Sequence, residues 1–268
     1  MNRPPQGPDT TAGGVRLFDD VRPDEADRAY LPGMSSAWKM PWYDVQSWWR
    51  RAGRLHRRTV ELAGIGRGQH VLDVGCGTGN LSLAVLRAVP DAAVTGLDPD
   101  GAALRRAARK ARRRRVGRRG SLTLVRGFAD RLPAPDAGVD HVLSSLALHH
   151  VPMDEKRRFA AELARVLRPG GTVTIADLDA PGHDGGHDGG HGPHGEQHGG
   201  HGTGHGQERG HGHGNHRRHE IGVNQHRADN ADGGIQRLLT DAGLADAREV
   251  GRGTFMDTPV MWVQARRP

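Results

Sequence analysis

The stretch from residue 71 to residue 80 constrains the fold of this chain more than any other segment. It reads VLDVGCGTGN, an apolar run typical of a β-strand followed by glycines at alternate positions, Gly75, Gly77 and Gly79. Glycine has no Cβ, so the backbone can turn sharply here and approach a ligand closely. A dinucleotide-binding fingerprint would have its third glycine one residue later, where this chain has Asn80. The spacing therefore disfavours a dinucleotide.

A carboxylate follows at the end of the next apolar run. Residues 92–97 form a second segment of strand type, and Asp98 comes directly after it. In a parallel sheet the carboxyl ends of neighbouring strands lie at one edge, so we expect Asp98 to lie beside the glycine turn. A carboxylate at that position suits the two hydroxyls of a ribose.

Four further blocks follow in order at α/β spacing. They are GFADRLP (127–133), DHVLSSLALHHV (140–151), LRPGG (167–171) and TVTIADL (172–178). Together with the glycine turn they resemble the motifs of the class I S-adenosylmethionine-dependent methyltransferases over roughly residues 55–180. Within that family, LPAPD and LRPGG are similar to blocks of the quinone-biosynthesis C-methyltransferases and their small-molecule relatives. A glycine triplet alone would be weak evidence, because such turns also pack helices against sheets.

The resemblance implies a set of S-adenosyl-L-methionine contacts. The residues near the methionine moiety would be Asp73, Gly75, Gly77, Thr78 and Gly79. Asp98 would accept hydrogen bonds from the ribose, and Phe128, Ala129 and Asp130 would hold the adenine. Ser145 would be a cofactor contact from the fourth strand. Taken singly, each aspartate would be interpreted as a helix cap or turn former. The register with the motifs favours the cofactor role.

The methyl acceptor is less well defined than the cofactor. His149 and His150 follow the fourth strand at the mouth of the expected site, and either could act as a general base, although a packed or surface histidine is the commoner outcome. The signature NPPY of amino-methylating enzymes is missing, and with Cys76 as the single cysteine the chain lacks the thiols of arsenite methyltransferases. We therefore expect a small-molecule acceptor.

Alternating strand and helix patterns predict an α/β fold, a Rossmann-like seven-stranded methyltransferase sheet with helices on both faces. The expected organisation is a disordered tail (1–29), an N-terminal helical arm (30–68), the cofactor-binding core (69–181), a His/Gly-rich insert (182–220) and a C-terminal completion of the sheet (221–268). Aromatic residues crowd the arm, at Tyr30, Trp38, Trp42, Tyr43, Trp48 and Trp49. They would either pack on the core or cap the cofactor and substrate.

The insert between the fifth strand and the last helix is dominated by glycine and histidine. It carries eleven histidines, His183, His187, His191, His194, His198, His201, His205, His211, His213, His216 and His219. With no apolar residues to build a core, this loop should be disordered without a ligand. Neutral imidazole binds zinc, nickel or copper, so we expect a divalent metal ion here. The alternative is a low-complexity expansion tolerated in a surface loop.

The net charge of +7 raises the question of nucleic acid. Ten cations lie between Arg105 and Arg119, but alanine and leucine recur through residues 103–111 at helical spacing. This pattern predicts an amphipathic helix with a solvated arginine face. No aromatic residue that could stack a base lies in that window. An RNA methyltransferase is therefore disfavoured.

At 268 residues, the chain suits one α/β domain with appendages. It has no apolar run long enough for a membrane span and no secretion signal at its N-terminus, so we expect a cytoplasmic protein. The function that these patterns favour is an S-adenosylmethionine-dependent methyltransferase with an accessory metal-binding loop. The alternative is a metal-handling or metal-sensing protein that uses the methyltransferase fold as a scaffold.

Overall fold

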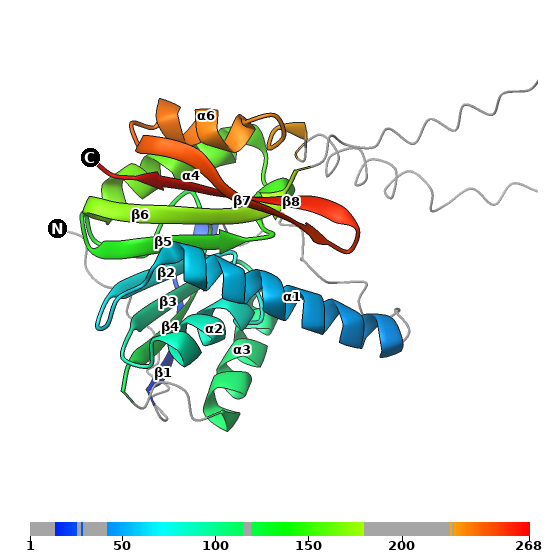
Figure 1. Ribbon diagram of the computed structural model, residues 1–268. Helices are drawn as coiled ribbons and strands as arrows, with labels where there is room; N and C mark the ends of the chain where they lie inside the picture. Colours follow the sequence, from blue (N-terminus) through cyan, green and yellow to red (C-terminus); the bar gives the residue numbers. More distant parts are fainter. Residues whose placement is uncertain (1–13, 26–27, 29–41, 115–118, 180–225, 227) are drawn as a thin grey trace, which may run out of the picture.

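The computed structural model of the protein describes residues 14–25, 28, 42–114, 119–179, 226 and 228–268, and for residues 42–50 it describes the backbone alone. Its centre is an eight-stranded sheet in the order β1-β4-β3-β2-β5-β6-β8-β7 (Figure 1). The strands are β1 (Val15–Asp19), β2 (His70–Val74), β3 (Ala93–Asp98), β4 (Ser121–Arg126), β5 (Val139–Ser145), β6 (Leu167–Leu178), β7 (Ala245–Phe255) and β8 (Thr258–Arg266). Strands β1 to β6 pair in parallel, and β8 pairs antiparallel with both β6 and β7.

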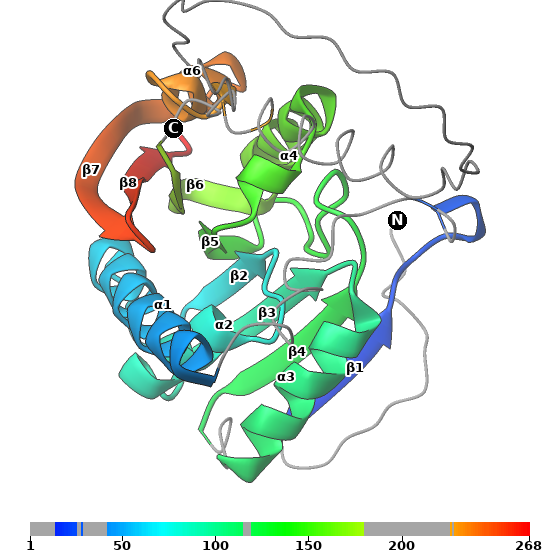
Figure 2. The same cartoon turned by 90° about the vertical axis from the view of Figure 1, so that its right-hand side faces the viewer.

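Helices cover both faces of the sheet, as the sequence predicts (Figure 2). The α-helices are α1 (Trp42–Ala63), α2 (Asn80–Ala88), α3 (Gly101–Arg113), α4 (Met153–Val166) and α6 (Gly234–Asp241), with short 3-10 helices η1 (Pro23–Glu25) and η3 (Leu148–His150). Helices α1, α2 and α3 pack on one face, and α4 and α6 pack on the other. The arrangement is a Rossmann-like α/β fold. No helix in the described part of the chain is long and apolar enough to span a bilayer.

The buried face of α3 follows the predicted periodicity. Its buried residues are Ala103, Leu104, Ala107, Ala108 and Ala111, and they pack against strands β3, β4 and β1. The exposed face carries the arginines, which confirms the amphipathic pattern. Lys110 departs from it, because its ammonium group lies partly buried against the glycine turn.

The first strand corrects the prediction that residues 1–29 form a disordered tail. Residues 15–19 form β1, which extends the sheet to eight strands by pairing in parallel with β4, Val15 with Leu122 through Asp19 with Arg126. Val15 is fully buried in the cluster under α3. A five-residue strand at an edge is stabilised by a partner more than a hundred residues away, so local periodicity gives little sign of it.

Strand β6 is longer than the sequence pattern predicts. LRPGG, expected as the turn before the fifth strand, is itself part of β6, and Leu167 pairs with Val139. The register shifts between Val139 and His141, and Gly170 has a positive φ of 78°. The segment is therefore a bulged start to the strand.

Helix α1 lies within the N-terminal helical arm expected at residues 30–68. Its last turns, with Val60 and Ala63, pack on the sheet beside α2. The crowded aromatic side chains at Tyr30, Trp38, Trp42, Tyr43, Trp48 and Trp49 lie outside the residues whose side chains the structure describes, as does the whole insert from residue 182 to 220.

The strand order reverses beside β2, which lies between β3 and β5. In open α/β sheets ligands bind at such a reversal, outside the carboxyl ends of the strands. Here these ends carry the glycine turn after β2, Asp98 at the end of β3, and Ser145 at the end of β5. The fold therefore brings the predicted cofactor residues to one edge.

Candidate active site at the carboxyl edge of the sheet

The turn after β2 is held by the backbone of β3. The amides of Gly75 and Cys76 both donate to the carbonyl oxygen of Leu97, at 2.9 and 3.0 Å. All three motif glycines have positive φ, between 51° and 73°, a region that side chains other than glycine's seldom adopt. The glycines therefore set the path of the turn, as the sequence spacing predicts.

Space around the three glycines differs sharply. A Cβ on Gly75 would lie 2.5 Å from the Cβ of Ala147, and one on Gly79 would lie 2.9 Å from the Cβ of Ala107. At Gly77 a Cβ would meet nothing within 4 Å. Gly75 and Gly79 therefore allow close packing, whereas the backbone at Gly77 faces open space at the edge of the sheet.

Asp98 is buried and accepts hydrogen bonds from two backbone amides. Its Oδ2 lies 2.7 Å from the Gly77 nitrogen, and its Oδ1 lies 2.9 Å from the Asp100 nitrogen. Burial raises the pKa of Asp98 to about 6, although the two amide hydrogen bonds act to lower it. This carboxylate is thus fixed next to the open backbone of Gly77, and each oxygen keeps a lone pair for a further donor.

Asp73, at the carboxyl end of β2, is hydrogen-bonded to α2. Its Oδ2 accepts hydrogen bonds from the Ser82 amide at 2.9 Å and the Ser82 hydroxyl at 2.5 Å, in the first turn of α2. Burial raises the pKa of Asp73 to about 7. In this structure the side chain ties β2 to α2, and we interpret it as a support for the turn.

Lys110 links α3 to the glycine turn. Its Nζ donates to Thr78 Oγ1 at 2.9 Å and to Asn80 Oδ1 at 2.7 Å. Burial lowers the pKa of Lys110 to about 8, and the charge of Arg114 acts in the same direction. The hydroxyl of Thr78, predicted near the methionine moiety, is thus engaged by a lysine that the sequence pattern assigned to the solvated face.

Phe128, Ala129 and Asp130 follow β4, but Asp130 is already paired. Both of its oxygens lie within 3.0 Å of Nη1 of Arg28, and Arg158 approaches to 3.4 Å. The guanidinium of Arg28 also lies over the Phe128 ring, 4.3 Å from its centroid, and its Nη2 is 2.9 Å from Glu155. Sequence patterns gave no sign of Arg28, because it comes from the segment expected to be a tail.

That N-terminal segment is attached to the same loop by several other ion pairs. Asp20 lies 2.7 Å and Glu25 3.2 Å from the guanidinium of Arg131, and Asp19 lies 3.2 Å from that of Arg126. Each is a partly exposed pair of modest strength, but together they form a network. Strand β1 and the residues after it therefore form one wall of the predicted adenine loop.

Ser145 and the two histidines lie at the end of β5. The Ser145 hydroxyl is buried and makes no hydrogen bond within the described part of the chain. Leu146, the next residue, has a positive φ of 55°, and η3 follows with His149 and His150, whose ring centroids are 4.0 Å apart. The structure thus brings Ser145 and both histidines to the edge that holds Asp98.

His149 is paired with an aspartate that sequence reasoning missed. Its Nδ1 lies 2.6 Å from Oδ1 of Asp177, near the end of β6. Asp177 is fully buried and also accepts from the backbone amides of Leu148 at 2.7 Å and Leu178 at 2.7 Å. Burial acts to raise the pKa of Asp177, but His149 and these amides outweigh it and hold the pKa below its usual value.

The hydrogen bond between His149 and Asp177 fixes both the orientation and the tautomer of the imidazole ring. An ionised Asp177 accepts a hydrogen bond from Nδ1–H, so Nε2 of the neutral ring carries the free lone pair. The arrangement is that of a general base oriented by a carboxylate. The signal in the sequence was an acidic residue inside an apolar strand, in TIADL.

Metal ligands do not gather elsewhere in the described residues. No group of three or more His, Cys, Asp or Glu side chains there is arranged to hold a metal ion. Cys76 is buried, its pKa is raised by burial, and its Sγ fills the space over Gly96. It packs as a small apolar turn residue.

Comparison with known proteins agrees with this geometry. The fold and the glycine turn are those of a Rossmann-like α/β protein. Residues 71–171 match the family model described as a methyltransferase domain.

Among curated proteins, the chain is 41% identical over 124 residues to a phthiotriol/phenolphthiotriol dimycocerosates methyltransferase of Mycobacterium tuberculosis, which covers 46% of this chain and 43% of the relative. It is 32% identical over 129 residues to a demethylmenaquinone methyltransferase of Listeria welshimeri, covering 48% and 52%. The chain thus matches only about half the length of these relatives.

Solved structures share the fold at low sequence identity. A SAM-dependent methyltransferase from Aquifex aeolicus superimposes with a TM-score of 0.52 at 18% identity, covering 78% of this chain and 88% of the other. The phosphoethanolamine N-methyltransferase 2 of Haemonchus contortus gives a TM-score of 0.56 at 16% identity, covering 80% and 52%.

Proposed function

We propose that this protein transfers the methyl group of S-adenosyl-L-methionine to a small-molecule acceptor. The observation that carries the proposal is the pairing of Gly77 and Asp98, in which an open glycine backbone and a buried carboxylate share one hydrogen bond at the carboxyl edge of the sheet. The matched methyltransferase domain and the small-molecule methyltransferases among its relatives support it.

The residues present fit the cofactor at three points. Asp98 is fixed by amides and keeps lone pairs for the ribose hydroxyls; the backbone at Gly77 borders open space; and the buried hydroxyl of Ser145 has no described partner. Such a buried hydroxyl usually has a partner, so a ligand contact there is consistent with its position. When bound, the cofactor supplies an electrophilic methyl group on a sulfonium.

His149 is the residue that we propose to remove a proton from the acceptor. With Nδ1 directed to Asp177, its Nε2 can accept a proton from an oxygen, nitrogen or activated carbon of the acceptor. The acceptor would then be the nucleophile toward the methyl group that the bound cofactor supplies, and Nε2 of His149 would hold the proton taken from the acceptor. Asp177 acts through His149 and is therefore a positioning residue.

Two measurements test the proposal in sequence. Calorimetric titration with S-adenosylmethionine should show a single site per chain, and incubation with methyl-labelled cofactor and a panel of quinols, phenols and lipid alcohols should yield a labelled organic product. His149→Gln should retain cofactor binding and lose most of the label transfer. A protein that binds no adenosyl ligand would contradict the assignment.

We further propose that the histidine-rich segment binds a divalent metal ion. Support comes from its composition alone, because residues 182–219 lie outside the described part of the chain. Imidazole must be neutral to bind, so zinc or nickel affinity should fall as the pH drops through about 6. Deleting residues 183–219 should abolish zinc binding and leave S-adenosylmethionine binding intact.

Zinc and S-adenosylmethionine titrations of the full-length chain and of the deletion variant distinguish the proposed enzyme from a metal-handling protein. A metal-handling protein that uses the fold as a scaffold would bind zinc through the segment and would bind no S-adenosylmethionine. An accessory metal loop on an enzyme would change label transfer when zinc or nickel is added to the full-length chain. Equal transfer with and without metal, and equal metal binding after the deletion, would end the proposal for the segment.

A further inference from the structure

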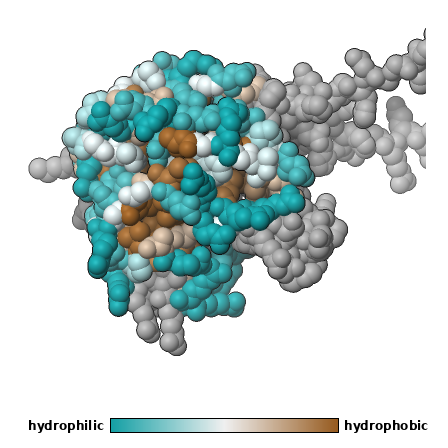
Figure 3. Space-filling view, viewed as in Figure 1, coloured by the Kyte–Doolittle hydropathy of each residue, from teal (hydrophilic) through white to brown (hydrophobic). Residues whose placement is uncertain are grey.

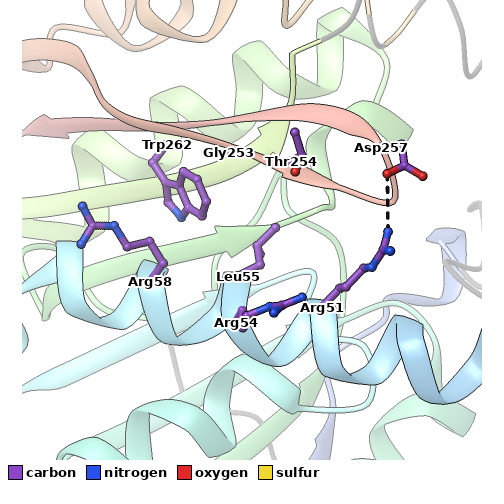
Figure 4. A pocket seen from close by; sticks show the side chains of 8 residues that line it. All are labelled: Arg51, Arg54, Leu55, Arg58, Gly253, Thr254, Asp257 and Trp262. Atoms are coloured by element: carbon purple, nitrogen blue, oxygen red, sulfur yellow. Dashed lines mark ion pairs between the residues drawn. The ribbon is translucent and has the colours of Figure 1, made fainter.

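A second recess, on the helical face formed by α1, is not part of the site described above. It lies between α1 and the hairpin of β7 and β8 and has a volume of about 410 Å³ (Figure 4). Its lining residues are Arg51, Arg54, Leu55, Arg58, Gly253, Thr254, Asp257 and Trp262. Recesses of this size hold small molecules. We refer to it as the arginine groove.

The groove has its own charge pattern. Arg51, Arg54 and Arg58 recur at three- and four-residue spacing on α1, so they share one side of the helix. Asp257 is the only acidic residue of the lining, which leaves a net charge of +2. In the space-filling view, hydrophilic and hydrophobic residues are mixed over this face of the molecule (Figure 3).

Ion pairs compensate these arginines only weakly. Arg51 lies 3.7 Å from Asp257, a side chain that is 97% exposed, and Figure 4 shows it directed at the tip of the hairpin. Arg58 lies 3.4 Å from Glu61, also exposed. Exposed pairs of this kind contribute about 0–1 kcal/mol. Arg54 is exposed and makes no ion pair with any residue whose side chain is described.

The floor of the groove is rigid and partly apolar. Trp262 on β8 donates from Nε1 to Thr59 Oγ1 at 2.9 Å, which fixes the indole. A Cβ on Gly253 would lie 3.1 Å from Cζ3 of that ring, so the strand beside the indole carries no side chain. Leu55 projects between the arginines from α1 (Figure 4). Trp262 is 6% and Leu55 5% exposed, so each offers a ligand only a small apolar edge beneath the cations.

The groove is separated from the His149 site by strand β6. Trp262 pairs with Ala176 and packs with it against α1, whereas Asp177, the next residue, contacts His149. Successive side chains of a strand point to opposite faces. The groove is therefore a distinct site, and its assignment does not depend on methyl transfer.

We propose that the arginine groove binds the phosphate group of a small phosphate ester whose organic part rests on Trp262 and Leu55. A phosphate monoester carries about −1.5 to −2 charges at pH 7, which matches the net charge of the lining. A guanidinium group can donate two hydrogen bonds to phosphate oxygens, and the three arginines of α1 line the same recess.

Calorimetric titration of the full-length protein with phenyl phosphate tests this proposal. Arg54→Gln should raise the dissociation constant about fivefold and the double variant Arg51→Gln/Arg54→Gln about tenfold or more, as expected on loss of charged hydrogen bonds. Arg57→Gln is the matched control, because Arg57 belongs to the same helix and does not line the groove. It should change the constant by less than about twofold.

Asp257→Asn should change the dissociation constant of phenyl phosphate in the opposite direction while leaving the three arginines in place. Asp257 has a positive φ of 62° in the hairpin turn, and asparagine tolerates that conformation. Removing its charge should tighten phenyl phosphate about twofold, because Arg51 loses its competing carboxylate. This variant keeps the test valid even if the double variant does not fold.

Two further ligands identify the source of the phosphate. Inorganic phosphate should bind more weakly than phenyl phosphate, because it lacks the apolar part. Vesicles of phosphatidylcholine containing phosphatidic acid should bind the unsubstituted protein no more tightly than they bind Arg54→Gln. Binding to vesicles without binding of phenyl phosphate, or an equal loss in Arg57→Gln, would overturn the proposal.

Discussion

His149 and Asp177 form a buried pair in which Nδ1 lies 2.6 Å from Oδ1. Because the carboxylate also accepts from the amides of Leu148 and Leu178, it cannot turn away from the ring. The neutral imidazole should therefore carry its proton on Nδ1. Long-range proton–nitrogen NMR should show this tautomer, with the signal assigned by its loss in His149→Gln.

Asp177→Asn is the variant that separates orientation from packing. Asparagine fills the same space but removes the charge, so the Nδ1–H tautomer should lose its preference and label transfer should fall about tenfold or more. Cofactor affinity should change little. An unchanged tautomer in Asp177→Asn would show that the carboxylate does not orient His149.

The glycine turn predicts two different outcomes for one kind of substitution. Gly75→Ala places a methyl 2.5 Å from Ala147 at a φ of 72°, so unfolding free energy should fall by roughly 2 kcal/mol or more. Gly77→Ala meets open space and should cost about 1 kcal/mol through its φ alone. Denaturant unfolding measures both, and equal losses would argue against this description of the turn.

Buried carboxylates predict how stability depends on pH. Burial raises the pKa of Asp73 to about 7, whereas in the unfolded chain it is about 3.9. Between these values the folded state holds a proton that the unfolded state has released. This contribution to stability is fully present below about pH 4 and is lost as the pH rises through about 7.

Asp73→Asn should therefore weaken the dependence of the unfolding free energy on pH. Between pH 4 and 7 the unfolding free energy of the variant should decrease less than that of the unsubstituted protein. The two slopes of unfolding free energy against pH should differ by up to about 1.4 kcal/mol per pH unit. Denaturant titrations at several pH values measure this. Parallel curves for the two proteins would mean that Asp73 is ionised throughout.

Arg28 predicts a role for the N-terminal segment. Its guanidinium pairs with Asp130 and lies over Phe128, so Arg28→Gln should release residues 14–28 from the loop and make them more susceptible to limited proteolysis. The loss in unfolding free energy should be about 1–3 kcal/mol, since partly buried charges lose their partner. Arg16→Gln, an exposed position on β1, is the control and should behave as the unsubstituted protein.

The order of strands and helices could be predicted from the sequence because each central element carries its own apolar periodicity. Residues 71–74, 94–97 and 141–145, for example, are all strand in the structure. The carboxyl edge was predictable for the same reason: glycines and Asp98 follow directly from buried strands. Local patterns were sufficient wherever the partner of an element is the sheet itself.

Features that depend on distant contacts were not predictable in this way. Strand β1 pairs with β4, more than a hundred residues away in the chain. Lys110 resembles the arginines around it until α3 is placed against the glycine turn. Asp177 belongs to an apolar strand, where an acid looks like an exception until His149 is beside it. In each case the decisive partner lies tens of residues away in the chain.

Asp98 is the residue on which the proposed cofactor site depends most directly. Calorimetric titration with S-adenosylmethionine should give a dissociation constant that falls as the pH rises through about 6, because the ionised carboxylate is the better acceptor for ribose hydroxyls. Asp98→Ala should raise that constant at least about tenfold and remove its pH dependence, while Asp136→Asn, an exposed control, should match the unsubstituted protein. Unchanged affinity in Asp98→Ala would contradict the proposed cofactor site.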